Sequence, residues 1–195
     1  KTMKPSPFLF LKNTNTREIY KTFSHFKHRF TDGNAVSEML YGIKHVIEKY
    51  GSLYRCFMSG FNNNDDIILP ALNAFVNELT SFYDVRQNSL LPSPEKGSAI
   101  KRLNLFLRWM VRYDEVDPGG WEGIPASKLV IPLDTHMHKI GLLLKLTERK
   151  QANLQTALEI TYAFRKIIPE DPVRYDFALT RMGIRKELDF HEFIR

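Results

Sequence analysis

The sequence predicts an all-α protein that folds as a single domain over residues 1–195. Apolar residues recur at intervals of three and four along most of the chain, which is the spacing of one buried helix face. No run of alternating apolar and polar residues is long enough to predict a strand. With 43% hydrophobic and 26% charged residues, a chain of this length buries a sizeable core without a disulfide or a metal ion.

The first fifty residues are predicted to form two helices. Apolar side chains repeat at helical spacing from Ile19 to Phe30, through Phe23 and Phe26, and again from Val36 to Ile47. The turn sequence Asp32-Gly33-Asn34 separates the two runs, and Gly51 is expected to end the second helix. Because the chain starts abruptly at Lys1, we expect a further helical segment to precede it.

A polar loop at 62–66 leads into a third predicted helix. This helix is expected to run from Ile67 to about Tyr83, with Asp65 or Asp66 as its cap. The next stretch, 89–98, holds two prolines and Gly97 and is therefore expected to be a loop.

A strongly patterned helix is predicted after that loop. Its apolar face is formed by Ile100, Leu103, Leu107 and Met110, and the helix is broken at 117–120 by Asp-Pro-Gly-Gly. From there to residue 133 the chain is expected to be mostly irregular.

Three helices are predicted in the remainder of the chain. Asp134 is the expected N-cap of the first, which carries apolar residues up to Leu144. The second spans 153–168, and the third is expected to start at Asp171, with Pro172 in the favoured first position, and to end at Gly183.

The charge balance favours an anionic partner, and nucleic acid is the first candidate. The chain has 28 Lys+Arg against 22 Asp+Glu, a formal net charge of +6. Arg108 and Arg112 follow Lys101 by seven and eleven residues, so the three basic side chains are expected close to one helix face. This face is expected to be either a DNA-facing ridge or an ordinary solvated surface. A second basic stretch, 181–186, adds Arg181, Arg185 and Lys186.

Composition excludes several classes of protein. No stretch approaches the ~18 apolar residues of a membrane span, so we expect no membrane partner. A single cysteine, Cys56, excludes an internal disulfide and a cysteine-held metal cluster, which suits a reducing cytoplasm. His136 and His138 are two residues apart and do not share a helix face, so no metal site is expected.

Two segments have a pattern that is typical of a reactive site. Residues 97–101, Gly-Ser-Ala-Ile-Lys, form a glycine turn that enters a helix, where free backbone N–H groups and the helix dipole favour a phosphate. Residues 133–137, Leu-Asp-Thr-His-Met, place the carboxylate of Asp134 at a helix start.

Together these segments resemble the helix-hairpin-helix DNA glycosylase superfamily. Members of that superfamily have a catalytic lysine after a glycine hairpin, and Lys101 lies four residues after Gly97, which is the same offset. They also have a helix-capping aspartate in a Val-Asp-Thr-His or Val-Asp-Val-His-Met context, which the segment around Asp134 resembles. The separation of 33 residues between Lys101 and Asp134 is similar to that in archaeal 8-oxoguanine glycosylases. Over nearly its whole length the chain also resembles an uncharacterised bacterial family known as a domain of unknown function, most clearly at 101–112 and 171–179.

The resemblance implies a DNA base-excision glycosylase with lyase activity that removes an oxidised purine such as 8-oxoguanine. It implies Lys101 and Asp134 as catalytic residues, damaged duplex DNA as the partner, no cofactor, and a monomer. The residues expected to contact DNA are Lys96, Gly97, Ser98, Ala99, Arg102, Arg108 and Arg112. The aromatic and acidic residues considered for the base pocket are Phe106, Trp109, Trp121, Asp171 and Tyr175.

The alternative is a DNA-binding module that keeps the scaffold and lacks the reaction. Two positions favour it. Ala99 stands where the superfamily has its second hairpin glycine, and Leu105 stands where the archaeal enzymes place an aromatic residue. A helical protein-interaction domain that binds no nucleic acid is a third possibility, against which the basic residues argue.

Overall fold

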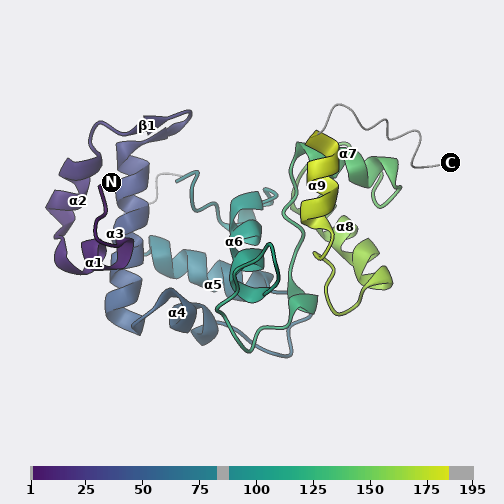
Figure 1. The fold of residues 1–195 in the computed structure, drawn as a ribbon, viewed down its shortest axis with the longest axis horizontal. Coiled ribbons are helices and arrows are strands. Elements are labelled where there is room, and N and C mark those ends of the chain that lie inside the picture. Colours follow the sequence, from purple (N-terminus) through teal and green to yellow (C-terminus); the bar gives the residue numbers. More distant parts are fainter. Residues whose placement is uncertain (1, 83–87, 185–195) are drawn as a thin grey trace. The chain divides into compact units, whose positions relative to one another are not determined.

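The computed structural model describes residues 2–82 and 88–184, whose regular secondary structure is almost entirely helical (Figure 1). The predicted all-α class is confirmed, with one small antiparallel hairpin in addition. The α-helices are α1 (Pro7–Asn13), α2 (Thr16–Phe23), α3 (Gly33–Tyr50), α4 (Leu53–Ser59), α5 (Leu69–Thr80), α6 (Lys101–Val111), α7 (Thr135–Leu143), α8 (Leu154–Ile167) and α9 (Asp176–Ile184). The strands are β1 (Lys27–His28) and β2 (Thr31–Asp32), and short 3-10 turns cover Pro94–Lys96 and Ala126–Lys128.

The chain divides into two compact units. Unit 1 comprises Lys1–Asn62 and Leu69–Ser93, and unit 2 comprises Asn63–Ile68 and Pro94–Arg195. The single domain expected over residues 1–195 stays a prediction.

Unit 1 is organised around the long helix α3, which packs against α2, α4 and α5. Leu11, Ile19 and Leu40 form a buried cluster between α1, α2 and α3. As predicted, α3 ends at Gly51, whose φ of +81° is the left-handed conformation that glycine adopts at low cost. Gly42 lets α5 approach closely, because a Cβ there would lie 2.0 Å from the carbonyl oxygen of Leu79.

The predicted helix from Ile19 to Phe30 is wrong beyond Phe23, where α2 ends. The chain turns at that point, with the N–H of Phe26 donating to the carbonyl of Phe23, and then forms the β1–β2 hairpin. Phe26 and Phe30 have helical spacing but no core to face: Phe30 is fully exposed. The hairpin instead brings Asp32 to the start of α3, where its side chain accepts from the N–H of Ala35 and caps the helix.

The third predicted helix exists as α5, but it begins at Leu69, and neither Asp65 nor Asp66 provides the side-chain cap expected. The Asp66 carboxylate instead accepts from Arg165 at 2.9 Å and from Tyr162 at 3.1 Å, within unit 2. Those two partners lower the pKa of Asp66, the hydrogen bond from Arg165 most strongly. The Asp66 carboxylate therefore pairs with Arg165, which is distant in sequence, and does not cap α5.

Unit 2 confirms the predicted helices at α6, α7 and α8. Asn153 caps α8 and Asp134 caps α7 through side-chain oxygens that accept backbone N–H groups. The last helix begins at Asp176 rather than Asp171. The chain first makes a turn, in which the backbone N–H of Arg174 donates to the carbonyl of Asp171. The end expected at Gly183 is also wrong, since α9 includes Ile184. Of the second basic stretch, Arg185 and Lys186 lie outside the described residues.

Two expectations drawn from composition can be compared with the described part of the chain. Cys56 is a free, buried cysteine, and burial raises the pKa of its thiol to about 11, so a thiolate is disfavoured. Within residues 2–82 and 88–184, no helix is long and apolar enough to cross a membrane.

Candidate functional site

The glycine turn that precedes α6 is held in place within unit 2. The carbonyl of Gly97 accepts from the N–H of Leu154 at 3.0 Å, and Ser98 forms a bridge with Asn153. The left-handed conformations fall on Gly97, with φ +73°, and on Ile100, with φ +39°, rather than on Ala99. The side chain of Ile100 is buried, so packing holds a conformation that isoleucine otherwise disfavours. The turn is thereby fixed against the start of α8, immediately before Lys101.

Lys101 and Asp134, which are 33 residues apart in sequence, meet at the starts of α6 and α7. The Lys101 Nζ donates to Asp134 Oδ2 at 2.8 Å. The other carboxylate oxygen, Oδ1, accepts from the N–H groups of His136 at 2.9 Å and Met137 at 2.8 Å. Capping and ion pairing thus use different oxygens of the same side chain, so Asp134 serves both at once.

The environment of this pair is asymmetric. The Lys101 side chain is 44% exposed, whereas that of Asp134 is 17% exposed. Burial acts to raise the pKa of the Asp134 carboxyl, but the hydrogen bonds from Lys101 and Met137 outweigh it, so the pKa lies below its ordinary value. The pair therefore places an amine that reaches solvent within proton-transfer distance of a fixed carboxylate, an arrangement typical of a lysine nucleophile beside an acid–base group.

The solvent-facing ridge expected on α6 is wrong for Arg108 and Arg112. Arg108 is 2% exposed and donates to Asp117 at 3.1 Å and to Asp176 at 2.5 Å. Arg112 is also buried; it donates to Asp171 at 2.9 Å and contacts Asp117 at short range. The face they share is covered by the chain after α6 and by the start of α9. Both guanidinium groups therefore form buried ion pairs within unit 2 and do not face solvent.

This buried charge cluster lies near Asp134. Burial raises the pKa of the Asp176 carboxyl, Arg108 opposes that rise, and the negative charge of Asp134 adds to it. The two carboxylates thus interact electrostatically, which agrees with the packing of α7 against α9. Two oxygens of the cluster, Asp117 Oδ1 and Asp171 Oδ1, are buried with no hydrogen-bond partner within the described residues.

The remaining residues expected to contact DNA lie around the start of α6. Lys96, Gly97, Ser98 and Arg102 are exposed there, and Ala99 is half-buried. DNA contact by these residues stays a prediction.

The residues considered for the base pocket have different environments. Phe106 and Trp121 pack edge to face, with ring centroids 5.4 Å apart, and Trp121 is buried. Trp109 and Tyr175 present exposed rings, 43% and 47% accessible. Asp171 is occupied by Arg112, as described above. Among these five residues, Trp109 and Tyr175 have the exposed rings, Phe106 and Asp171 are partly buried, and Trp121 is buried.

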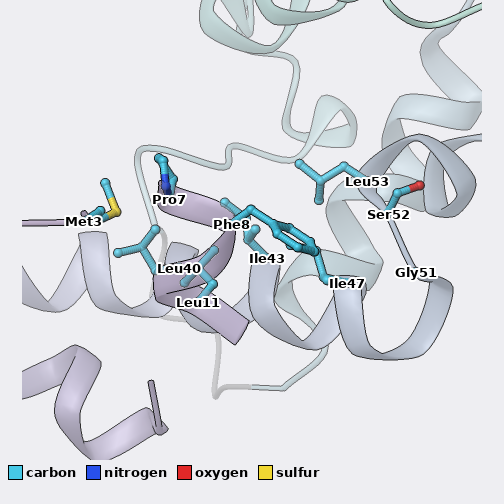
Figure 2. Close-up of a pocket in the computed structure, with 10 residues that line it drawn as sticks. All are labelled: Met3, Pro7, Phe8, Leu11, Leu40, Ile43, Ile47, Gly51, Ser52 and Leu53. Atoms are coloured by element: carbon cyan, nitrogen blue, oxygen red, sulfur yellow. The ribbon is translucent and has the colours of Figure 1, made fainter. Parts of the chain in front are cut away.

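The sequence did not indicate two cavities that the structure contains. In unit 1, an apolar cavity of about 390 Å³ lies between α1 and α3 and is lined by residues that include Phe8, Leu40 and Ile47 (Figure 2). In unit 2, a polar cavity of about 380 Å³ is lined by Asp66, Lys128 and Arg165, among others. The first could not be foreseen because α1 was not predicted, and the second because Asp66 was assigned to a helix cap.

No metal site is evident in the described part of the chain, where no group of three or more His, Cys, Asp or Glu side chains is arranged to hold an ion. Of the two histidines examined for this role, the ring of His138 contacts the carbonyl of Arg149 through Nε2 at 2.7 Å.

Replacement of Arg108 by methionine tests the buried charge cluster. The Arg108→Met variant leaves Asp117 and Asp176 buried beside one cation fewer, so we expect the free energy of unfolding to fall by about 3–5 kcal/mol. Arg102→Met, on an exposed position of the same helix, is the matched control and is expected to change it by less than about 0.5 kcal/mol. Urea unfolding followed by circular dichroism measures both; equal stabilities for the two variants would contradict the assignment.

Two substitutions of Asp134 separate its cap from its charge. Asparagine caps helices as well as aspartate does, so Asp134→Asn loses only the ion pair, whereas Asp134→Ala also loses a cap of about 1 kcal/mol. Because the folded-state pKa of Asp134 lies below its ordinary value of 3.8, the ion pair stabilises the protein above that value and is lost as pH falls through the lowered pKa.

The difference in unfolding free energy between the native chain and Asp134→Asn should therefore shrink between pH 5 and pH 2. Urea titrations across this range measure it. A difference that stays constant would show that the carboxylate gains nothing from Lys101.

The comparisons with known proteins identify the family of this chain and no activity. The family described as "Protein of unknown function (DUF2400)" matches residues 1–185, a range that contains Lys101, Asp134 and the buried charge cluster. No curated protein and no solved structure matches the chain significantly. The chain belongs to the DUF2400 family of proteins of unknown function.

Proposed function

We propose that the protein is a DNA base-excision glycosylase with lyase activity that removes an oxidised purine such as 8-oxoguanine. The observation that supports the proposal is the 2.8 Å contact between Lys101 and Asp134. These are the two residues to which the resemblance to helix-hairpin-helix glycosylases assigns the chemistry. A lysine and a capping aspartate that were separated in space would have removed the basis for the proposal.

In the proposed reaction, Lys101 is the nucleophile and Asp134 the proton acceptor. The ammonium gives a proton to the carboxylate, and the free amine attacks C1′ of the damaged nucleotide, forming an N–C bond. The C1′–N9 bond breaks, and the base leaves with its electron pair and takes up a proton. That proton comes from Asp134, which is thereby restored to a carboxylate and stabilises the positive charge left on the adduct of the sugar and Lys101.

The covalent intermediate then accounts for the lyase activity. The Asp134 carboxylate takes a proton from the nitrogen of this adduct, and the nitrogen lone pair then expels O4′ from C1′. O4′ takes up a proton as the sugar opens, and the product is a protonated imine, the Schiff base. Loss of a proton from C2′ breaks the C3′–O3′ bond, so the 3′ phosphate departs and the strand is cut. Water hydrolyses the imine and releases Lys101 as the amine.

The residues around Lys101 are suited to hold the DNA backbone. Lys96 and Arg102 are exposed cations on either side of it, and the turn at Gly97 leads into the positive end of the α6 dipole. A base flipped out of the duplex needs a stacking partner, for which the exposed rings of Trp109 and Tyr175 are candidates. We propose that this reaction takes place in a reducing cytoplasm, where the buried Cys56 stays a thiol.

The second candidate is a DNA-binding module without the reaction. Leu105 favours it, because an aromatic side chain at this position stacks on the base in the archaeal enzymes that the chain resembles. In this case the contact between Lys101 and Asp134 is an ion pair that joins two helix starts and contributes to folding only.

Borohydride trapping distinguishes the two candidates. The protein is incubated with duplexes that contain 8-oxoguanine, uracil or an abasic site, and sodium borohydride reduces any imine to a stable adduct. We expect an adduct on the 8-oxoguanine and abasic duplexes, at least a hundredfold less with Lys101→Gln, and unchanged DNA binding by that variant. Lys139→Gln, an exposed position on α7, is the control and should be trapped like the native chain.

The outcome that contradicts the enzyme is the absence of any adduct on all three duplexes while binding persists. Salt-sensitive binding that Lys101→Gln leaves unchanged would then support the module. An adduct that forms equally with Lys101→Gln would assign the chemistry to another lysine and overturn the proposed site.

A further inference from the structure

The hairpin of unit 1 presents aromatic and cationic side chains together in solvent. Phe30 is 100% exposed and Phe26 is 42% exposed. The cationic and titratable side chains between and beside them, also exposed, are His25, Lys27, His28 and Arg29. Residues 19–31 contain no aspartate or glutamate. The acidic residue opposite Lys27 is Asp32, whose carboxylate caps α3 by accepting from the N–H of Ala35.

The base of the hairpin is fixed by the helices on either side (Figure 1). Lys27 pairs with Asp32 and His28 with Thr31, which leaves Arg29 and Phe30 as a two-residue loop. Gly33, the first residue of α3, is buried so tightly against the end of α2 that a Cβ would lie 1.9 Å from the Phe23 carbonyl oxygen. The loop residues are thus displayed from a well-packed base.

The two loop residues, Arg29 and Phe30, contribute little to the stability of the folded protein. A phenylalanine ring that is fully exposed buries no apolar surface and contributes no hydrophobic stabilisation. Arg29 adopts a φ of +54°, a conformation that favours glycine or asparagine over a long side chain. A two-residue hairpin loop imposes this conformation, so the pair contributes little to the stability of the fold, and both side chains are exposed to a ligand.

We propose that this hairpin is a binding surface for single-stranded or unpaired nucleic acid. Phe30 would stack on one unpaired base, and Lys27 and Arg29 would contact the phosphates on either side of it. Interleaved aromatic and cationic side chains bind single strands in this way, because every base has a face on which to stack. The proposal concerns unit 1 and does not depend on the lysine chemistry proposed for unit 2.

The composition of the hairpin argues against a membrane as the ligand. Insertion into a lipid surface requires an apolar face of some area, usually with several large side chains. Here one ring is fully exposed and is flanked directly by Arg29, whereas the other ring is less than half exposed. Stacking on a single base needs no more than one ring.

Binding of fluorescein-labelled 20-nucleotide single strands of mixed sequence, measured by fluorescence anisotropy with the whole chain, tests the proposal. Phe30→Ala is expected to weaken binding about tenfold. Phe8→Ala, a half-exposed phenylalanine on α1 of the same unit, is the matched control and should bind like the native chain. Phe30→Trp should retain binding, and its indole fluorescence should be quenched by the strand as the ring stacks on a base.

The salt dependence tests the phosphate contacts separately. The double variant Lys27→Gln/Arg29→Gln should lower the slope of log affinity against log salt by about 1.4, because each phosphate contact on a single strand contributes about 0.7. Lys4→Gln/Lys12→Gln, at exposed lysines of unit 1 outside the hairpin, should leave the slope unchanged.

Two results would overturn the proposal. One is equal affinity of Phe30→Ala and Phe8→Ala for the single strands, with no quenching in Phe30→Trp. The other is binding of the native chain to phosphatidylserine vesicles, lost in Phe30→Ala, without binding to the single strands, which would identify a lipid surface as the ligand.

Discussion

Arg108, buried on α6, constrains much of the arrangement of unit 2. Its guanidinium donates to Asp117 in the chain after α6 and to Asp176 at the start of α9, so three separate segments meet at one side chain. A buried charge without partners is very costly, which means that these segments can pack only where the carboxylates reach the guanidinium. Because Lys101 and Arg108 lie on the same helix, the cluster also fixes the orientation of the helix that carries the proposed nucleophile. The negative charge of Asp134 also raises the pKa of Asp176, so the buried cluster and the Lys101–Asp134 ion pair interact electrostatically.

Much of the fold could be predicted from local sequence, and the errors have a common cause. Asp134 caps the helix that it was expected to cap, α8 begins within one residue of its predicted start, and Gly51 ends α3, because the interactions that set these limits are made within a few residues of the chain. Asp66 and Asp171 look equally suitable as caps, but both are engaged by arginines distant in sequence. Sequence spacing does not reveal such partners, so the helix starts assigned to these two residues are wrong.

The candidate site could be predicted only in part, because sequence spacing shows which residues share a helix face but not which distant residues cover that face. The proximity of Lys101 and Asp134 agrees with what the resemblance led us to expect, although a separation of 33 residues does not by itself imply contact. Helical periodicity correctly grouped Arg108 and Arg112 with one another, but it cannot tell a solvated face from one that other segments cover with carboxylates. The hairpin was missed because Phe26 and Phe30 have the spacing of a helix, and only tertiary structure shows that there is no core for them to face.

In the proposed reaction, the amine of Lys101 forms a covalent bond to the sugar of a damaged nucleotide. Peptide mapping of the borohydride-reduced complex by tandem mass spectrometry tests it most directly, because it locates the modified atom rather than a loss of activity. After nuclease and protease digestion, the account predicts a deoxyribose-derived mass on Lys101 and an unmodified Lys96. A remnant on another lysine, or no modified peptide from a complex that binds the duplex, would contradict it.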